Sequence, residues 1–190
     1  MANQSSAPTS TARTVQASRT VVLGLGNPLL CDDAVGLRVA AALQELMQAD
    51  PVDGVTVVTS TRAGFELIDL LAGANEAIII DCLDVPDAEP GRVRRLDLQH
   101  VAGSARLVGA HDLDVAAAFQ LATAMGVSMP DLVEIYGVEA AETRRFSERL
   151  TPAVETAAAM LARDLHARLK ARGCPPSAPG ACPSNRATRS

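Results

Sequence analysis

The amino-acid sequence predicts an α/β fold, a three-layer α/β/α arrangement with a mostly parallel five-stranded sheet and helices on both faces. Strand-like runs alternate with helical patterns along the chain, which is typical of a sheet whose strands are joined by crossover helices. The first three strand-like runs are rich in β-branched residues and lack a clean polar–apolar alternation. That pattern favours strands that are buried on both faces, as in a parallel sheet.

Five runs are expected to form the strands of this sheet. They are 20-TVVLGL-25, 55-VTVVTS-60, 77-AIIIDC-82, 92-RVRRLDL-98 and 132-LVEIYGV-138. Ligands of such sheets bind in the crevice beyond the carboxyl ends of the strands. A functional site is therefore expected among the residues that directly follow these runs.

Helical patterns occupy the segments between and after the strands. They cover residues 33–48, 64–73, 112–126 and 151–173. The first repeats its apolar residues at a spacing of three and four, and the second and third end on Gly73 and Gly126, a common helix stop. In the last helix Thr151 can cap, Pro152 fits the first turn, and Gly173 follows the end.

The length of 190 residues favours one domain, which we place at residues 19–173. Residues 1–18 are expected to be a disordered leader, because they lack the apolar centre of a secretory signal. Residues 174–190 form a Pro/Ser-rich tail that is also expected to be disordered. No apolar run approaches the roughly 18 residues that a membrane span needs, so we expect no membrane partner and a cytoplasmic location.

Composition argues against a nucleic-acid partner. The net charge is −5, no basic run occurs, and the chain has three Phe, one Tyr and no Trp for stacking on bases. Four cysteines do not make a disulfide framework at this length. Cys31 and Cys82 lie in apolar surroundings and are interpreted as small buried hydrophobic residues.

The segment 24-GLGNPLLCDD-33 follows the first strand like the turn of a dinucleotide-binding domain. That fingerprint needs a third glycine for close packing of helix on strand, and position 29 is leucine. A pyrophosphate would lie at the helix N-terminus, where Asp32 and Asp33 would repel it. The dinucleotide interpretation is therefore disfavoured.

Three polar residues, Asp33, Asp81 and His111, fall where the carboxyl ends of the strands should meet. Two carboxylates and one imidazole suit a borderline divalent metal, and three protein ligands leave positions open for water or substrate. Each residue also has a plain alternative. The aspartates could cap the helix and a turn, and His111 could be an ordinary histidine.

Other catalytic arrangements have less support. No G-x-S-x-G segment occurs, so a serine nucleophile on a strand-to-helix elbow is not indicated. A cysteine peptidase built on Cys31 and His111 lacks any local signature. His100 is expected in a loop and His166 on a solvated helix face.

The segment GLGNPLLCDDAVGLRV resembles the N-terminal signature of the hydrogenase maturation endopeptidases. The resemblance continues through AIIIDCLD, which contains Asp81, and GAHDLDVAAAF, which contains His111. It extends to IYGVEA and to LTPAVETA at the start of the last helix. It covers roughly Thr20 to Arg172, and four ordered motifs are far more specific than a glycine turn alone.

The resemblance implies a peptidase that removes a C-terminal extension from the large subunit of a nickel–iron hydrogenase after nickel insertion. Residues matching Asp33, Asp81 and His111 bind a metal in the cleft of that family. The nickel is carried by the substrate, a large-subunit precursor, and the site could also take other divalent metals. The resemblance leaves open whether the metal activates water or is only recognised, so the catalytic type, aspartic or metal-dependent, stays open. A monomer is expected.

Two neighbours are expected to support this turn: Asp32 to cap or orient it rather than bind metal, and Asn27 to hold the loop by side-chain hydrogen bonds. One segment departs from the family. It reads 59-TSTRAGFEL-67, with Arg62 inserted and no acid between Asp53 and Glu66 where family members carry one. This departure leaves open which hydrogenase is the partner. It also admits a second hypothesis, a non-catalytic checkpoint or chaperone that binds the same precursor.

Overall fold

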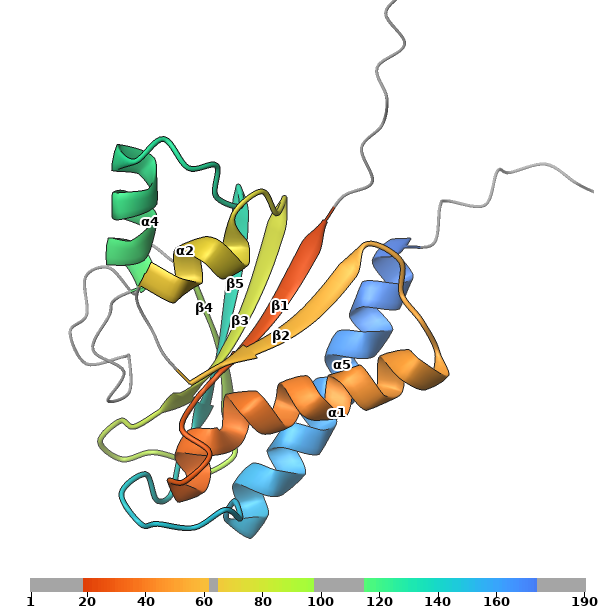
Figure 1. Cartoon of the computed structure of the whole chain (residues 1–190). Helices are drawn as coiled ribbons and strands as arrows, with labels where there is room; N and C mark the ends of the chain where they lie inside the picture. Colours follow the sequence, from red (N-terminus) through yellow and green to blue (C-terminus); the bar gives the residue numbers. More distant parts are fainter. Residues whose placement is uncertain (1–18, 62–64, 98–114, 174–190) are drawn as a thin grey trace, which may run out of the picture.

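The computed structural model describes residues 19–61, 65–97 and 115–173. The predicted leader (1–18) and tail (174–190), together with Arg62, His100 and His111, lie outside the described residues. The described part of the chain folds around one sheet with helices on both sides (Figure 1). The predicted α/β class is confirmed.

Five strands form one sheet in the order β2-β1-β3-β5-β4. Neighbouring strands are parallel except β4, which runs antiparallel to β5 at the edge. The strands are β1 (Thr20–Leu25), β2 (Val55–Ser60), β3 (Glu76–Leu83), β4 (Val93–Asp97) and β5 (Leu132–Glu139). The carboxyl ends of the four parallel strands therefore share one edge of the sheet.

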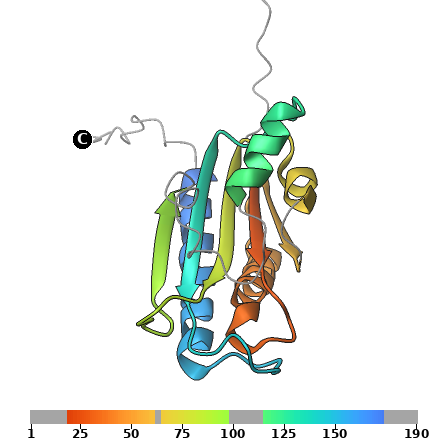
Figure 2. The same cartoon turned by 90° about the vertical axis from the view of Figure 1, so that its left-hand side faces the viewer.

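The helices cover the two faces of the sheet in pairs (Figures 1 and 2). They are the 3-10 turn η1 (Cys31–Ala34), α1 (Val35–Ala49), α2 (Phe65–Leu71), α4 (Val115–Ala124) and α5 (Pro152–Gly173). Helices α1 and α5 pack on one face, where Val39, Leu43 and Leu165 join one apolar cluster. Helices α2 and α4 pack on the other face through a second cluster that includes Leu67 and Ala118.

Most element positions agree with the sequence-based expectation. Strands β1 and β2 match residue for residue, and α5 begins at Pro152, directly after Thr151. The expected helix 33–48 opens differently, because its first turn is the 3-10 turn η1. His166 was expected on a solvated face, and this was wrong: its side chain is 13% exposed, and its Nε2 lies 2.8 Å from the carbonyl oxygen of Asp50.

Within residues 19–61, 65–97 and 115–173, no helix is both long and apolar enough to cross a membrane.

Candidate active site

The loop between β1 and α1 carries the first predicted site residue. Gly26 has a φ of 150°, and a Cβ there would lie 2.1 Å from the carbonyl oxygen of Asp33, so only glycine lets the chain pass this close. The backbone N–H of Asn27 donates to Oδ2 of Asp33 at 3.1 Å, and its side-chain Oδ1 accepts from the N–H of Leu29 at 3.0 Å. The expectation that Asn27 holds this loop is confirmed.

The start of α1 lies directly on the ends of β1 and β3. A Cβ added to Gly36 would lie 2.2 Å from the carbonyl oxygen of Leu25 and 2.3 Å from that of Ile80. Asp81 follows Ile80 directly, and η1, which contains Asp33, contacts β3. The fold therefore brings Asp33 and Asp81 to the same edge of the sheet, as the sequence predicts.

Both carboxylates are largely withdrawn from solvent, with Asp33 3% and Asp81 8% exposed. The negative charge of these carboxylates affects the pKa of the neighbouring Cys82 thiol. Burial raises its pKa, and the negative charges of Asp81 and then Asp33 raise it further. Negative charge is therefore concentrated at this point of the sheet edge, and Cys82 stays a neutral thiol at pH 7.

The side chains of β3 alternate between the two faces. Cys82 joins the apolar cluster under α1 and α5, and Ile79 joins the cluster under α2 and α4. By alternation Asp81 belongs to the second face. Cys31 and Cys82 are both buried and not disulfide-bonded, which confirms their interpretation as small buried hydrophobic residues.

His111, the third predicted ligand, lies outside the described residues, so the complete trio stays a prediction. In the part of the chain that the structure describes, no three His, Cys, Asp or Glu residues are grouped to hold a metal ion. Asp33 and Asp81 nevertheless fit a divalent ion as oxygen ligands. Helix α4, which begins four residues after His111, packs on the face to which Asp81 belongs.

Asp32 is used in a different way from its neighbour. It is fully buried, and its carboxylate accepts hydrogen bonds from the N–H groups of Ala141 (2.9 Å), Glu142 (3.1 Å) and Thr151 (2.7 Å). The hydroxyl of Thr151 donates to it as well, at 2.9 Å. Asp32 thus ties the β1–α1 loop to the segment that leads into α5, and the expectation that it orients the turn is confirmed.

Backbone contacts reinforce this connection between the two loops. The N–H of Asp32 donates to the carbonyl of Glu142, and the N–H of Ser147 donates to the carbonyl of Leu29, both at 3.0 Å. Leu30 and Phe146 form an isolated antiparallel bridge. The β5–α5 segment therefore forms a second wall beside the aspartates.

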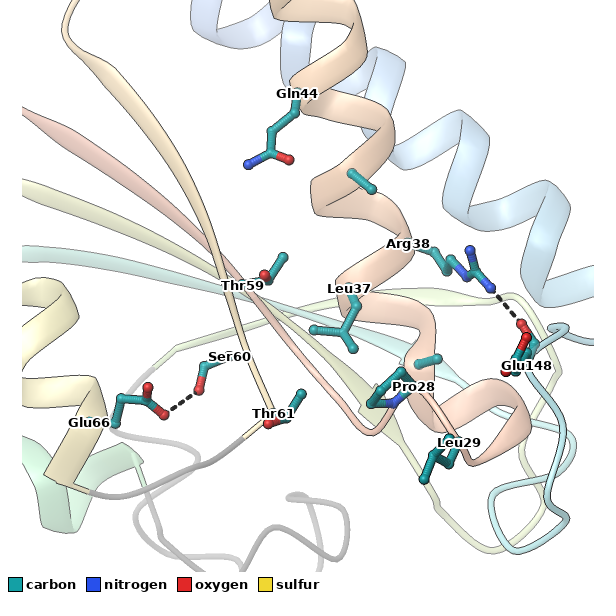
Figure 3. A pocket seen from close by; sticks show the side chains of 12 residues that line it. Pro28, Leu29, Leu37, Arg38, Gln44, Thr59, Ser60, Thr61, Glu66 and Glu148 are labelled. Carbon is teal, nitrogen blue, oxygen red and sulfur yellow. Dashed lines mark hydrogen bonds between the residues drawn. The ribbon is translucent and has the colours of Figure 1, made fainter.

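A pocket of about 600 Å³ opens next to this loop, between α1 and the end of β2 (Figure 3). Glu66, in the first turn of α2, points into it and accepts a 2.7 Å hydrogen bond from the hydroxyl of Ser60. The sequence lacks an acid in the loop after β2, but the fold places Glu66 at the end of that strand. The six-residue spacing between Ser60 and Glu66 gives no sign of this pairing, because it depends on how α2 packs back.

A further buried acid, Glu139, ends β5 and was not singled out from the sequence. It is fully buried, accepts the N–H of Glu89 at 2.5 Å, and forms an ion pair with Arg94 of β4. Burial alone would raise the pKa of Glu139, but the bonds from Arg94 and Glu89 outweigh it, and the net pKa is lowered. The arginines in 92-RVRRLDL-98, facing a glutamate on β5, were the available signal.

The family model for HycI, hydrogenase maturation protease, matches residues 37–166. The hydrogenase expression/formation protein HupD of Thiocapsa roseopersicina is 28% identical, over 75% of this chain and 67% of that protein. The hydrogenase 2 maturation protease of Escherichia coli is 36% identical over a shorter stretch, 38% of this chain and 43% of that protein.

Solved structures agree in fold. The hydrogenase maturating endopeptidase HybD from E. coli superposes with a TM-score of 0.67 at 28% identity, covering 82% of this chain and 94% of that chain. The nickel–iron hydrogenase maturation protease HybD from Thermococcus kodakarensis superposes with a TM-score of 0.63 at 23% identity, covering 80% and 99%.

Proposed function

Because the chain belongs to the hydrogenase maturation protease family, a family of peptidases, we propose that it removes the C-terminal extension of a nickel–iron hydrogenase large-subunit precursor. The observation that carries this proposal is the meeting of Asp33 and Asp81 at the carboxyl edge of the sheet. The tight contacts of Gly36 bring the two loops together there. We place the reaction in the cytoplasm and propose that the protein acts as a monomer.

We propose that Asp33, Asp81 and His111 recognise nickel that the precursor already carries. Two carboxylate oxygens and an imidazole nitrogen match the preferences of nickel and of other divalent first-row metals. The negative charge of Asp33 and Asp81 supports the recognition of a cation. These carboxylates raise the pKa of Cys82, and a divalent cation would offset their charge. A precursor without nickel would bring no cation to offset this negative charge, so it would bind less tightly.

The chemistry proposed is the hydrolysis of one peptide bond. Water adds to the scissile carbonyl carbon and the C–N bond breaks, so that one new carboxyl end and one new amine end result. An aspartate within hydrogen-bond reach of that water can accept its proton, and Asp33 and Asp81 are the candidates for this role. The metal, when bound, would supply polarisation of the carbonyl.

A cleavage assay tests this function. The protein is incubated with nickel-loaded and nickel-free large-subunit precursor, and the mass of the large subunit is measured. We expect loss of the C-terminal extension only from the nickel-loaded form, and no cleavage by Asp33→Asn, Asp81→Asn or His111→Ala. Asp69→Asn removes an exposed carboxylate of α2 and should cleave normally. Normal cleavage by Asp81→Asn would refute the site assignment.

The second candidate function is a checkpoint that binds the nickel-loaded precursor without cutting it. The absence of an acid in 59-TSTRAGFEL-67 before Glu66 favours it, and the placement of Glu66 beside Ser60 argues against it. In the same assay a checkpoint would form a stable complex with precursor of unchanged mass.

A further inference from the structure

Large apolar side chains are exposed at the carboxyl edge of the sheet. Leu29 is 54%, Phe65 70% and Phe146 82% exposed. Two of the three phenylalanines of the chain are thus held in solvent at this edge. We call Leu29, Phe65 and Phe146 the apolar rim. Exposed aromatic side chains are enriched at protein interaction sites.

The residues of the apolar rim line the 600 Å³ pocket or lie close in the chain to residues that do. Leu29 is part of the pocket wall, as are Glu66 and Glu148 (Figure 3). In the chain, Phe65 directly precedes Glu66, and Phe146 lies two residues before Glu148. Ala34, another wall residue, directly follows Asp33. The pocket therefore shares the β1–α1 segment with the candidate active site, and its volume lies in the range of ligand-binding clefts.

One wall of the pocket is β2, which within the described residues is an edge strand that pairs with β1 alone. Gln44 Nε2 donates to the carbonyl oxygen of Val57 at 3.0 Å, which indicates that the backbone groups of Val57 point away from β1. In a parallel strand the residues two apart share this direction, so Thr59 presents its N–H and C=O on the same side. An extended peptide can pair with such an edge.

A positive charge lies on the opposite wall. The guanidinium of Arg38 donates to the carbonyl oxygen of Glu148 at 2.5 Å. Among residues 19–61, 65–97 and 115–173, no carboxylate forms an ion pair with it, whereas Arg92, Arg94 and Arg95 each have one. The guanidinium of Arg38 can therefore donate hydrogen bonds to a carboxylate of a bound peptide.

We propose that this pocket and its apolar rim bind an extended stretch of the C-terminal extension of the precursor, which pairs with β2 at Thr59 and places a carboxylate on Arg38. The inference rests on the proposed function, since it names where that substrate lies. Backbone pairing supplies affinity for an extended chain, the rim supplies desolvated apolar contact, and Arg38 selects an acidic residue or chain end. Because Ala34 lines the pocket and follows Asp33, this path leads the chain of the substrate toward the candidate active site.

The experiment measures binding rather than cleavage. Two probes are used: a nickel-loaded large-subunit precursor, and the same nickel-loaded protein ending at its mature C-terminus. The expected result is at least about tenfold tighter binding of the precursor, measured by biolayer interferometry. Thr59→Arg, which fills the pocket, and Phe65→Ser with Phe146→Ser should each remove most of that difference, as should Arg38→Glu, while Arg38→Lys retains it.

A matched control is available at the opposite end of the strands, where Leu132 begins β5. Met125 and Leu132 are 62% and 50% exposed there. Met125→Ser with Leu132→Ser should keep the full difference, and circular dichroism checks that each variant is folded. Equal affinity for both probes, or full affinity in folded Thr59→Arg and Arg38→Glu, overturns the inference. If the extension increases affinity but no mass change follows, the peptidase proposal fails while the binding site stands.

Discussion

Gly24 of β1 and Gly36 of α1 pack directly against each other. A Cβ on Gly24 would lie 2.2 Å from the carbonyl oxygen of Gly36, and a Cβ on Gly36 would lie 2.2 Å from that of Leu25. These gaps are smaller than any side chain tolerates, so the helix begins in contact with the strand backbone. This contact places η1, and with it Asp33, over the end of β3.

Gly36→Ala should therefore damage the fold itself. The added methyl group meets backbone atoms that cannot rotate away, so we expect a loss of about 3 kcal/mol or more in the free energy of unfolding, measured by urea denaturation. Gly73→Ala is the control, because a Cβ there meets nothing within 4 Å and only the φ of 70° opposes it. We expect about 1 kcal/mol for that change. Equal losses would contradict the close contact.

Substitutions of the adjacent Asp32 and Asp33 should have different effects, one on stability and the other on cleavage. Asp32→Asn replaces a buried acceptor of four hydrogen bonds by a group that also donates, so we expect a loss of about 3 kcal/mol in unfolding free energy. Asp33→Asn should abolish cleavage of the nickel-loaded precursor and change stability by less than about 1 kcal/mol. Denaturation and mass spectrometry together separate the two effects, and the reverse pattern would exchange the assigned roles.

Acid should weaken the protein through Glu139 and Glu134. The pKa of each is lowered from its ordinary value of 4.5, since the bonds from arginines outweigh burial. Their stabilisation is complete above the unfolded value and is lost as the pH falls through the lower folded value. Glu139→Gln should be about 2 kcal/mol less stable at pH 7 and show a flatter decline between pH 4.5 and pH 3 than the wild type.

Exposed Glu45→Gln is the matched control for this pH series, and urea midpoints from pH 7 to pH 3 are the measurement. An unchanged slope in Glu139→Gln would show that the ion pair with Arg94 contributes nothing to acid stability.

Neither buried cysteine should be needed for catalysis. Cys82 stays a thiol because burial and the neighbouring aspartates raise its pKa, and Cys31 is fully buried with its Sγ 3.4 Å from the carbonyl oxygen of Arg149. Cys31→Ala and Cys82→Ala should each retain cleavage, at a cost of about 1 kcal/mol in stability. Loss of cleavage in a folded Cys31→Ala would revive the cysteine-peptidase hypothesis.

The strands could be predicted from the sequence because burial on both faces leaves an apolar run that is visible without any tertiary information. β1 and β2 were found residue for residue for this reason. Two pairings could not be predicted, Ser60 with Glu66 and Glu139 with Arg94, because both depend on how separate elements pack. The placement of Asp33 and Asp81 at one end of the sheet was predictable because parallel strands send their carboxyl ends there, whereas their role as ligands and the part of His111 stay predictions.

The anchoring of two loops by Asp32 separates what is fixed from what can vary. Its carboxylate accepts from the backbone N–H groups of Ala141, Glu142 and Thr151 and from the hydroxyl of Thr151. The outward side chains of the same segment, among them Arg144 and Phe146, take no part in that anchoring. The outward side chains of the β5–α5 segment can therefore change, and with them the protein that is bound, while the position of the β1–α1 loop that carries Asp33 stays the same.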